Sequence, residues 1–322
     1  MKNQPEIMFE SAFAEDTFKG LTSDPKYLLS KYIYDKKGDK LFQQIMDMPE
    51  YYLTTSEFNI LELNAEDIVS SFSNESGIDL IELGAGDGKK TKILLKKLVE
   101  KGHKFDYLPI DISQNVLDEL KESLEKEIPE AKVRVQQGTY FKTLEKLSEY
   151  NTRKKVILVL GSNIGNLSHK EAVDFLEHIA RAMSKEDMLF MGFDQKKHPQ
   201  KILDAYNDPA GITEEFNKNL LVRINSELQG NFDPDKFLHW ETYDPETGTA
   251  KSFLVSKEQQ QVSIQKLDLK INFAPWETIH TEISQKYDDS VVKWLADEAG
   301  LSVEKSFADK ENSYKNYIFR RK

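Results

Sequence analysis

Apolar and polar residues alternate through the middle of the chain in a way that predicts a repeating order of strand and helix. Short apolar runs have the length and composition of buried strands, and each is followed by a segment with the three-to-four-residue apolar spacing of a helix. The strands are expected at residues 79–83, 105–110, 133–136, 156–160 and 188–193. The run at 156–160 is the most apolar of the sequence and should be the central strand. This alternation predicts a parallel sheet with right-handed crossovers.

The flanking regions have a different pattern. Helix-like spacing between residues 27 and 63, interrupted by Gly38 and Pro49, predicts helices joined by turns and no clear strand. After Asp194, helices are expected at 201–206, 213–228 and 291–299, β-hairpins at 253–256 and 262–273, and strands at 301–307 and 314–319. We therefore expect an α/β domain with a mainly parallel sheet at 62–196 and 288–322, and an α+β domain at 1–61 and 197–287.

Composition narrows the class of protein. The 322 residues include 44 Lys and Arg and 55 Asp and Glu, a net charge of −11, which disfavours a nucleic-acid partner. No cysteine is present, so disulfides, thiolate metal sites and cysteine nucleophiles are excluded, and the six histidines show no metal-binding spacing. We expect no metal. No run approaches the roughly 20 apolar residues of a membrane span, and residues 1–14 lack the apolar core of a signal peptide, so we expect a cytoplasmic protein without a membrane partner.

The strand at 79–83 leads into a glycine-rich turn, Gly84-Ala85-Gly86-Asp87-Gly88, and the next strand ends at Asp111. Glycines let the backbone approach a ligand, and an acid at the next strand end can bind two ribose hydroxyls. The spacing is wrong for a P-loop, and Lys89 stands where a dinucleotide fingerprint needs glycine or alanine. The turn thus suits S-adenosylmethionine, although a plain βα turn would look the same.

A second turn, Gly161-Ser162-Asn163-Ile164-Gly165-Asn166, follows the central strand. It lies where ligands bind in open α/β sheets, so Asn166 is a candidate substrate ligand. From spacing alone, Asn166 could equally cap the following helix.

Polar and aromatic residues of the flanking regions allow two interpretations. If 278–287 is extended, alternation places His280, Glu282 and Ser284 on one face, where they could bind a polar ring or amine or could simply be solvated. The aromatic residues Tyr51, Tyr52 and Tyr206 could line a site or pack at the edge of the core.

These segments together resemble the histidine-specific S-adenosylmethionine-dependent methyltransferases, whose best-known members make hercynine in ergothioneine biosynthesis. The resemblance covers nearly the whole chain. The stretches that carry it are Tyr34-Asp35-Lys36-Lys37-Gly38, Pro49-Glu50-Tyr51-Tyr52, Glu82-Leu83-Gly84-Ala85-Gly86, Lys90-Thr91-Lys92, Pro109-Ile110-Asp111-Ile112-Ser113, 161–166, Ala205-Tyr206-Asn207-Asp208, Gly211-Ile212-Thr213, Phe216-Asn217-Lys218-Asn219-Leu220 and 281–287. It implies a Rossmann-like class I methyltransferase domain and a second, substrate-binding α+β domain.

The resemblance also implies roles for individual residues. The methyl donor would be held by Gly84, Gly86, Lys92, Asp111, Thr139 and Tyr140. The amino-acid substrate would be bound by Tyr51, Asn166, Tyr206, Ser252, Glu282 and Ser284, with Tyr34 and Asn166 at the reacting amine. The expected activity is trimethylation of the α-amine of L-histidine by a monomer.

The sequence departs from the family pattern at three positions. Thr139 replaces the usual acid in Gly138-Thr139-Tyr140, Thr55 replaces an arginine, and Ser252 replaces a methionine beside the acceptor ring. Because Ser252 falls in the substrate pocket, the same chemistry on another amino acid, such as an aromatic one, is the close alternative. A catalytically silent small-molecule binder is a second, and a dehydrogenase a distant third.

Overall fold

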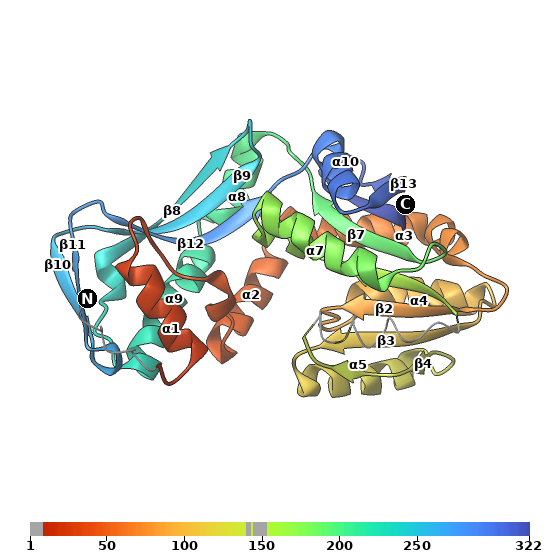
Figure 1. Cartoon of the computed structure of the whole chain (residues 1–322), viewed down its shortest axis with the longest axis horizontal. Helices are drawn as coiled ribbons and strands as arrows, with labels where there is room; N and C mark the ends of the chain where they lie inside the picture. Colours follow the sequence, from red (N-terminus) through yellow and green to blue (C-terminus); the bar gives the residue numbers. More distant parts are fainter. Residues whose placement is uncertain (1–8, 140–142, 144–152) are drawn as a thin grey trace, which may run out of the picture. The chain divides into compact units, whose positions relative to one another are not determined.

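The computed structural model describes residues 9–139, 143 and 153–322 of the chain (Figure 1). It divides into two compact units that we describe separately. Unit 1 contains residues up to Tyr52 together with Lys197–Ser284, and unit 2 contains Leu53–Lys196 together with Gln285–Lys322. The boundaries between the units thus fall after residues 52, 196 and 284, whereas the sequence predicted them after residues 61, 196 and 287.

Unit 2 is built on an eight-stranded sheet with helices on both faces. The path through the sheet is β13-β14-β7-β6-β2-β3-β4, and β5 pairs with β3. Its strands are β2 (Ile78–Leu83), β3 (Phe105–Asp111), β4 (Lys132–Val133), β5 (Gln136–Gln137), β6 (Lys154–Val159), β7 (Met188–Asp194), β13 (Leu301–Ala308) and β14 (Tyr314–Arg321). From β7 to β4 and β5 the pairs are parallel, whereas β13 and β14 run antiparallel. The predicted, mainly parallel α/β sheet is confirmed.

Alternating side chains of the strands bury two apolar layers. In β6, Ile157 and Val159 belong to a core shared with α7 and α10, whereas Val156 and Leu158 belong to a core shared with α3, α4 and α5. The helices of this unit are α3 (Tyr52–Phe72), α4 (Lys89–Glu100), α5 (Gln114–Glu127), α7 (His169–Ala182) and α10 (Asp289–Glu298), with the 3-10 turn η2 (Asn163–Asn166). A strand covered on both faces must be apolar throughout, which explains why β6 was recognisable.

One predicted strand of this sheet was wrong in its extent. The sequence pattern favoured a single strand at 133–136, but the structure forms β4 and β5 on either side of Arg134. Arg134 N donates instead to the Tyr107 carbonyl at 2.8 Å. Both short strands pair with β3, so the sheet edge keeps its expected place.

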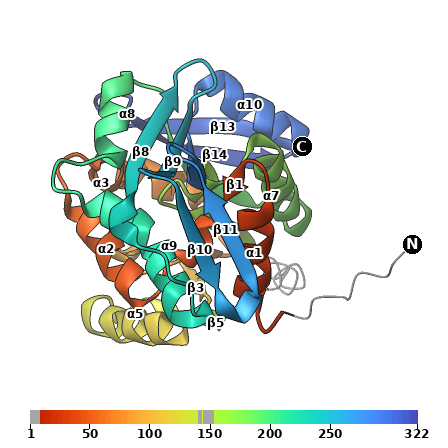
Figure 2. The same cartoon turned by 90° about the vertical axis from the view of Figure 1, so that its left-hand side faces the viewer.

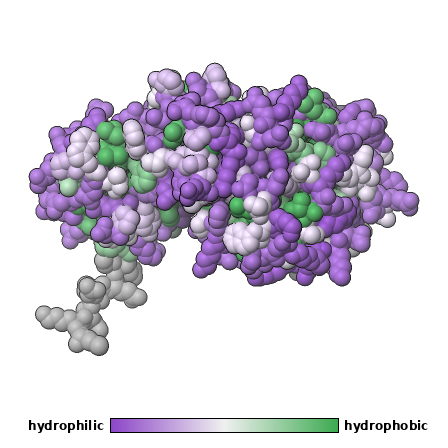
Figure 3. All heavy atoms as spheres, turned by 90° about the horizontal axis from the view of Figure 1, so that it is seen from above, coloured by the Kyte–Doolittle hydropathy of each residue, from purple (hydrophilic) through white to green (hydrophobic). Residues whose placement is uncertain are grey.

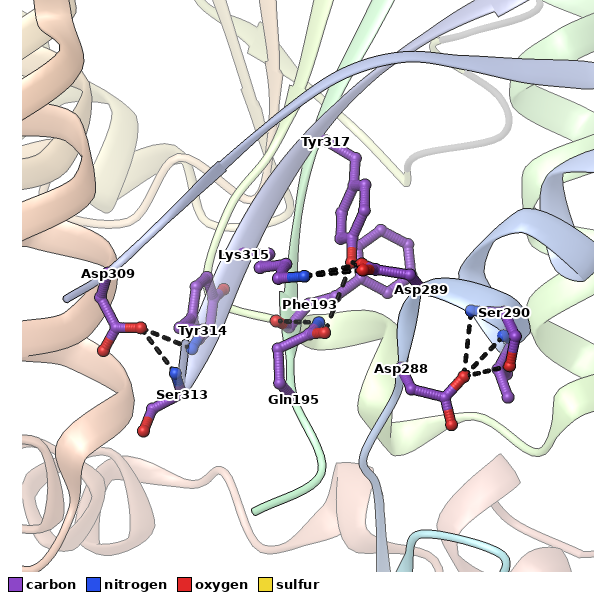
Figure 4. A network of polar contacts seen from close by, with 11 residues as sticks. Phe193, Gln195, Asp288, Asp289, Ser290, Asp309, Ser313, Tyr314, Lys315 and Tyr317 are labelled. Carbon is purple, nitrogen blue, oxygen red and sulfur yellow. Dashed lines mark hydrogen bonds and ion pairs between the residues drawn. The ribbon is translucent and has the colours of Figure 1, made fainter. Parts of the chain in front are cut away.

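The start of α10 is tied to the last strand, β14, by a polar network (Figure 4). Asp289 accepts hydrogen bonds from Tyr317 Oη at 2.5 Å and from Lys315 Nζ at 2.8 Å. Asp288 caps the helix by accepting from the Ser290 and Val291 amides, each at 3.0 Å. The Ser290 hydroxyl bond is the largest cause that lowers the pKa of Asp288 to about 2, so this cap is charged at neutral pH.

Unit 1 contains a four-stranded sheet, ordered β1-β12-β9-β8, and a separate hairpin of β10 and β11. The strands are β1 (Lys26–Tyr27), β8 (Phe237–Asp244), β9 (Thr249–Ser256), β10 (Gln260–Ile264), β11 (Leu269–Phe273) and β12 (Thr278–Gln285). The helices are α1 (Ala12–Thr22), α2 (Lys36–Asp47), α8 (Pro199–Tyr206) and α9 (Ile212–Leu228), with 3-10 turns η1 (Ser30–Tyr32), η3 (Pro234–Lys236) and η4 (Gln265–Leu267). This is the predicted α+β organisation.

The core of unit 1 lies where α9 packs against β8 and β9, as Figure 2 shows. Phe216 of α9 belongs to the same buried cluster as Phe237, Leu254 and Ile279 of the sheet. The sequence pattern predicted no clear strand in the N-terminal region. This prediction was wrong, because β1 forms there and pairs in parallel with β12. Its partner lies about 250 positions away, so local periodicity carried no signal for it.

Polar residues cover most of the face of the molecule that Figure 3 shows, with hydrophobic residues in small separate groups. Among the helices of the described residues, none combines the length and apolar character that crossing a bilayer requires.

Candidate active site

Three loops of unit 2 meet at one edge of the sheet. β2, β3 and β6 run parallel, so the segments that follow them begin at the same side. These are the glycine turn 84–88, the turn after Asp111, and the turn 161–166. Ligands of open α/β sheets bind at this carboxyl edge.

The glycine turn combines a packing requirement with an open approach. Gly88, at φ +65°, is the N-cap of α4, and a Cβ there would lie 2.4 Å from Leu120 Cδ1. Gly86, at φ +53°, would direct a Cβ into open space. Gly88 is therefore needed for packing, whereas the backbone at Gly86 is accessible to a ligand. Gly84 fixes the start of the turn by donating its amide hydrogen to the Ile110 carbonyl at 2.9 Å.

Asp111, the last residue of β3, keeps one carboxylate oxygen available. Its Oδ1 accepts from the Ser113 amide at 3.0 Å, and within the described residues Oδ2 accepts no hydrogen bond. The Asp111 carbonyl accepts from the Gly138 amide at 3.0 Å, which places Thr139 beside this strand end. Tyr140 lies outside the described residues.

Lys92 lies on α4, where its ammonium contacts α5. Its Nζ donates to Ser123 Oγ and pairs with Glu127 Oε1, both at 2.6 Å, and its side chain is 13% exposed. A contact between Lys92 and the carboxylate of a methyl donor would have to use the third N–H of the ammonium or replace one of these two bonds.

Glu82 is fully enclosed below the glycine turn. It accepts hydrogen bonds from Thr91 Oγ1 at 2.5 Å and from the Tyr107 hydroxyl. Burial, to which the nearby charge of Glu57 adds, raises the pKa of Glu82 to about 7. Near neutral pH this carboxyl is therefore divided between its two protonation states.

Asn166 is the last residue of η2. The helix after it begins at the N-cap Ser168, which forms a capping box with Glu171. The alternative that Asn166 caps this helix is therefore wrong. Its side chain is exposed and makes no hydrogen bond within the described residues. Tyr287 Oη holds the turn by donating to the Ile164 carbonyl at 3.0 Å.

Unit 1 gathers three tyrosines of distant sequence position. The Tyr51 ring lies edge-on to the Tyr206 ring, with centroids 6.2 Å apart. Tyr34 lies edge-on to Phe42 and Phe216, at 5.5 and 5.4 Å. Glu282, Tyr51 and Tyr206 are among the groups that raise the pKa of Tyr34, so these four residues lie in one region of unit 1, which we call the tyrosine cluster.

Tyr206 joins this cluster to β12 through its hydroxyl. Its Oη and Ser284 Oγ are 2.7 Å apart, and both residues are buried. The Tyr206 carbonyl accepts from His239 Nε2 at 2.9 Å, which fixes the end of α8. Burial lowers the pKa of His239, so the imidazole is neutral and donates only through Nε2. Tyr206 is thus anchored at both its backbone and its side chain.

Tyr34 presents a neutral phenol. Although 37% of the residue is exposed, its hydroxyl end is enclosed. Burial, and after it the negative charge of Glu282, holds the pKa of Tyr34 well above its usual value. At neutral pH the phenol can donate or accept a hydrogen bond without carrying charge.

The expected alternation along β12 holds only in part. Burial alternates from Thr278 to Glu282, then breaks, because Ser284 and Gln285 are both buried. His280 packs on Phe253, with ring centroids 5.4 Å apart, whereas Ser284 contacts Tyr206.

Ser252 lies in β9, directly opposite Glu241 of β8. Its Oγ donates to Glu241 Oε2 at 2.6 Å, and both side chains are buried. The Ser252 carbonyl accepts from Thr281 Oγ1 at 3.2 Å, one residue before Glu282. The position that departs from the family pattern is therefore half of a buried carboxylate–hydroxyl pair, which no local sequence pattern indicates.

The structure thus brings the predicted residues together in two groups. Tyr34, Tyr51, Tyr206, Glu282 and Ser284 cluster in unit 1, whereas the glycine turn, Asp111 and Asn166 share the sheet edge of unit 2. Across residues 9–139, 143 and 153–322 no cluster of three potential metal ligands exists.

Sequence reasoning missed Glu57, a buried carboxylate that contacts two of the sheet-edge loops. A signal was present in α3, because Glu57 falls on the buried stripe that contains Leu53, Ile60 and Leu61. A charge on an apolar helix stripe needs a partner elsewhere in the fold.

Comparison with known proteins agrees with this geometry. Residues 13–321 match the family described as histidine-specific, SAM-dependent methyltransferase. A histidine N-alpha-methyltransferase of Mycobacterium tuberculosis is 32% identical over 301 residues, which cover 90% of this chain and 92% of the relative. One of Mycolicibacterium smegmatis is 34% identical over 90% of this chain and 89% of its own length.

A fungal relative, ergothioneine biosynthesis protein 1 of Schizosaccharomyces pombe, is 29% identical over 97% of this chain and 40% of its own length. The family match spans both units and nearly the whole sequence. The chain belongs to the histidine-specific S-adenosylmethionine-dependent methyltransferase family.

Proposed function

We propose that this enzyme methylates the α-amine of L-histidine, in successive steps, to the trimethylated betaine hercynine. The observation that carries the proposal is the cluster in unit 1, where a hydroxyl pair, Tyr206 and Ser284, lies with the Glu282 carboxylate and a neutral phenol, Tyr34. A carboxylate beside hydroxyl groups can accept the N–H of an imidazole, and it disfavours an apolar ring that would leave it unpaired.

The donor site in this proposal is the sheet edge of unit 2. The accessible backbone at Gly86 and the available oxygen of Asp111 suit the amino-acid tail and the ribose of S-adenosylmethionine. Gly84, Thr139 and Tyr140 complete this site, and Lys92 joins it once released from Glu127. When bound, S-adenosylmethionine supplies an electrophilic methyl carbon on a sulfonium.

Acceptor residues have a simple task in such a transfer. In each transfer an N–C bond forms in line with the S–C bond that breaks, and S-adenosylhomocysteine leaves. The ammonium formed in the first and second transfers loses a proton before the next one, whereas the third transfer gives a quaternary nitrogen with no proton to lose. The side chains must align a neutral amine and exclude water. We assign the amine and carboxylate of the substrate to Asn166 and Tyr206, pocket closure to Tyr51, the imidazole to Glu282 and Ser284, and the methylated nitrogen to Tyr34.

The test is direct. Purified protein is incubated with S-adenosylmethionine and single amino acids, and products are read by mass spectrometry for one, two or three added methyl groups. Histidine should carry three. Absence of any histidine product would refute the substrate assignment, and binding of S-adenosylhomocysteine without turnover would indicate a silent binding protein. Turnover that survives a chelator would agree with our proposal that the enzyme needs no metal. We also propose that the enzyme is a monomer and cytoplasmic.

A second candidate is the same transfer to another amino acid, such as an aromatic one. The buried Ser252–Glu241 pair favours it, because the polar pair stands where the resemblance places a methionine beside the acceptor ring. Tryptophan and tyrosine in the same assay distinguish the two candidates.

A further inference from the structure

Glu57 of α3 is a fully buried carboxylate that receives hydrogen bonds from three separate parts of unit 2. Its Oε2 accepts from Lys90 Nζ at 2.6 Å and from the Gly161 amide at 2.8 Å. Its Oε1 accepts from Asn316 Nδ2 of β14 at 2.8 Å. Glu57 is therefore a junction between a helix, a loop and a strand that are distant in sequence.

The space for this carboxylate is provided by Gly192 of β7. A Cβ at Gly192 would lie 2.3 Å from Glu57 Oε1. The same Cβ would also lie against Tyr314 Oη, so the absence of a side chain at Gly192 leaves room for both groups.

Two of the three donors lie next to the ligand-binding end of the sheet. Lys90 is the second residue of α4, two positions after the last residue of the glycine turn, whereas Gly161 begins the turn that carries Asn166. Both donate to the same oxygen atom, Oε2. A single atom thus ties the glycine turn to the Asn166 turn.

Neither charge of this junction is favourable alone. A buried carboxylate is costly without partners, and a lysine in the first turn of a helix is opposed by the helix dipole. The ion pair offsets both costs, and the two amide donors satisfy the remaining lone pairs. Removal of either charge leaves the other uncompensated.

We propose that Glu57 is a positioning residue of the methyl-donor site, which holds the start of α4 and the Gly161 turn at the separation that donor binding requires. The inference rests on the proposed function for the assignment of these two loops to the site. It extends that function, because Glu57 itself contacts no substrate.

Asp187 provides a matched control in the same unit. Its carboxylate is also buried, pairs with Lys155 Nζ at 3.3 Å and accepts from the amides of Lys155 and Ser184 at 2.7 and 2.6 Å. Lys155 lies at the start of β6, at the edge of the sheet opposite to the ligand loops. The two carboxylates thus share their burial and their type of partners but differ in their distance from the site.

The experiment compares Glu57→Gln with Asp187→Asn by thermal unfolding and by calorimetric titration with S-adenosylhomocysteine. Both variants should lower Tm. Only Glu57→Gln should raise the Kd, by about tenfold or more, since small displacements of positioning groups have effects of that size. An unchanged Kd in Glu57→Gln, or equal rises in both variants, would overturn the inference.

If Glu57→Gln does not fold, the double variant Glu57→Gln/Lys90→Gln replaces it, because it leaves no buried charge unpaired. The double variant should recover Tm but keep the raised Kd, and wild-type affinity would refute a positioning role. The titration contains no amino acid, so its result is independent of whether histidine is the acceptor.

Discussion

The two units hold their candidate site residues by different means. In unit 2 the site is made largely of backbone: an open glycine turn, a strand end and a 3-10 turn at one edge of a parallel sheet. In unit 1 it is made of side chains, since Tyr34, Tyr206 and Glu282 come from segments up to about 250 positions apart and meet through hydroxyl, ring and carboxylate groups.

This difference indicates a division of work. Backbone groups at a sheet edge recognise features that every methyl donor molecule shares, whereas a side-chain cluster can distinguish one acceptor from another. Apart from Asn166, which the proposed function assigns to the acceptor, substitutions in unit 2 should therefore change donor affinity or the stability of its support. Substitutions in unit 1 should change acceptor turnover alone.

Glu282→Ala should have the largest effect and should fall on the acceptor only. Because the tyrosine cluster loses the carboxylate that accepts the imidazole N–H, kcat/KM for histidine should fall by about 100-fold or more. The Kd for S-adenosylhomocysteine should stay at its wild-type value. The measurement is steady-state kinetics with calorimetry on the same preparation.

Glu277→Ala is the control for this change. Glu277 precedes β12 and pairs with Lys26, outside the tyrosine cluster. It should retain histidine turnover. A loss of turnover equal to that of Glu282→Ala, or a weakened donor Kd in Glu282→Ala, would break the division between the units.

Glu82→Gln tests the support of the glycine turn through pH. The pKa of Glu82 is raised to about 7 from an ordinary 4.5, so the native state binds this proton more tightly than the unfolded chain does. The corresponding stability is complete below about pH 4.5 and is lost as pH rises through about 7. Between pH 5 and 8 the free energy of unfolding of Glu82→Gln should therefore gain roughly 2–3 kcal/mol relative to the wild type.

Denaturant unfolding at several pH values measures this difference. Glu62→Gln, which alters an exposed carboxyl of α3, is the control. Parallel pH profiles for the wild type and Glu82→Gln would show that the carboxyl is not the source of the effect.

The same contrast explains how far the sequence could predict this molecule. The sheet, the glycine turn and Asp111 at a strand end follow from local patterns, because apolar runs and turn residues act over a few positions. The Asn166 question could not be decided until the capping box at Ser168 was seen.

Local sequence patterns could not predict which distant residues contact each other through their side chains. The pairing of β1 with β12, of Ser252 with Glu241, and of Glu57 with Gly161 joins residues that only the fold brings together. For Lys92, the family resemblance implied a ligand contact, whereas the structure shows a pair with Glu127. Each of these contacts depends on the tertiary fold, and the periodicity of the sequence does not encode it.

Gly86→Ala separates a binding role from a conformational one. Gly86 and Gly102 both have positive φ, +53° and +68°, and at both a Cβ would meet open space. Each alanine should cost about 1–2 kcal/mol of stability, the cost of a left-handed residue with a side chain. Only Gly86→Ala should raise the Kd for S-adenosylhomocysteine, by about tenfold, because Gly102 lies in the turn after α4, away from the ligand edge. Equal affinities in the two variants would show that the approach to Gly86 is not used.

The smallest effect is expected from Tyr206→Phe, which keeps the ring contact with Tyr51 and removes only the hydroxyl. A neutral hydrogen bond contributes about 0.5–1.5 kcal/mol, so KM for histidine should rise no more than about tenfold. Tyr52→Phe is the matched control, because the Tyr52 hydroxyl accepts a hydrogen bond from Lys197 Nζ at 2.6 Å. The KM of this variant for histidine should not change. Since the Tyr206 hydroxyl and Ser284 Oγ are 2.7 Å apart, Ser284→Ala should add little in a Tyr206→Phe background. Fully additive effects of the two substitutions would mean that the two hydroxyl groups are not energetically coupled. In that case coupling between side chains would not distinguish unit 1 from unit 2.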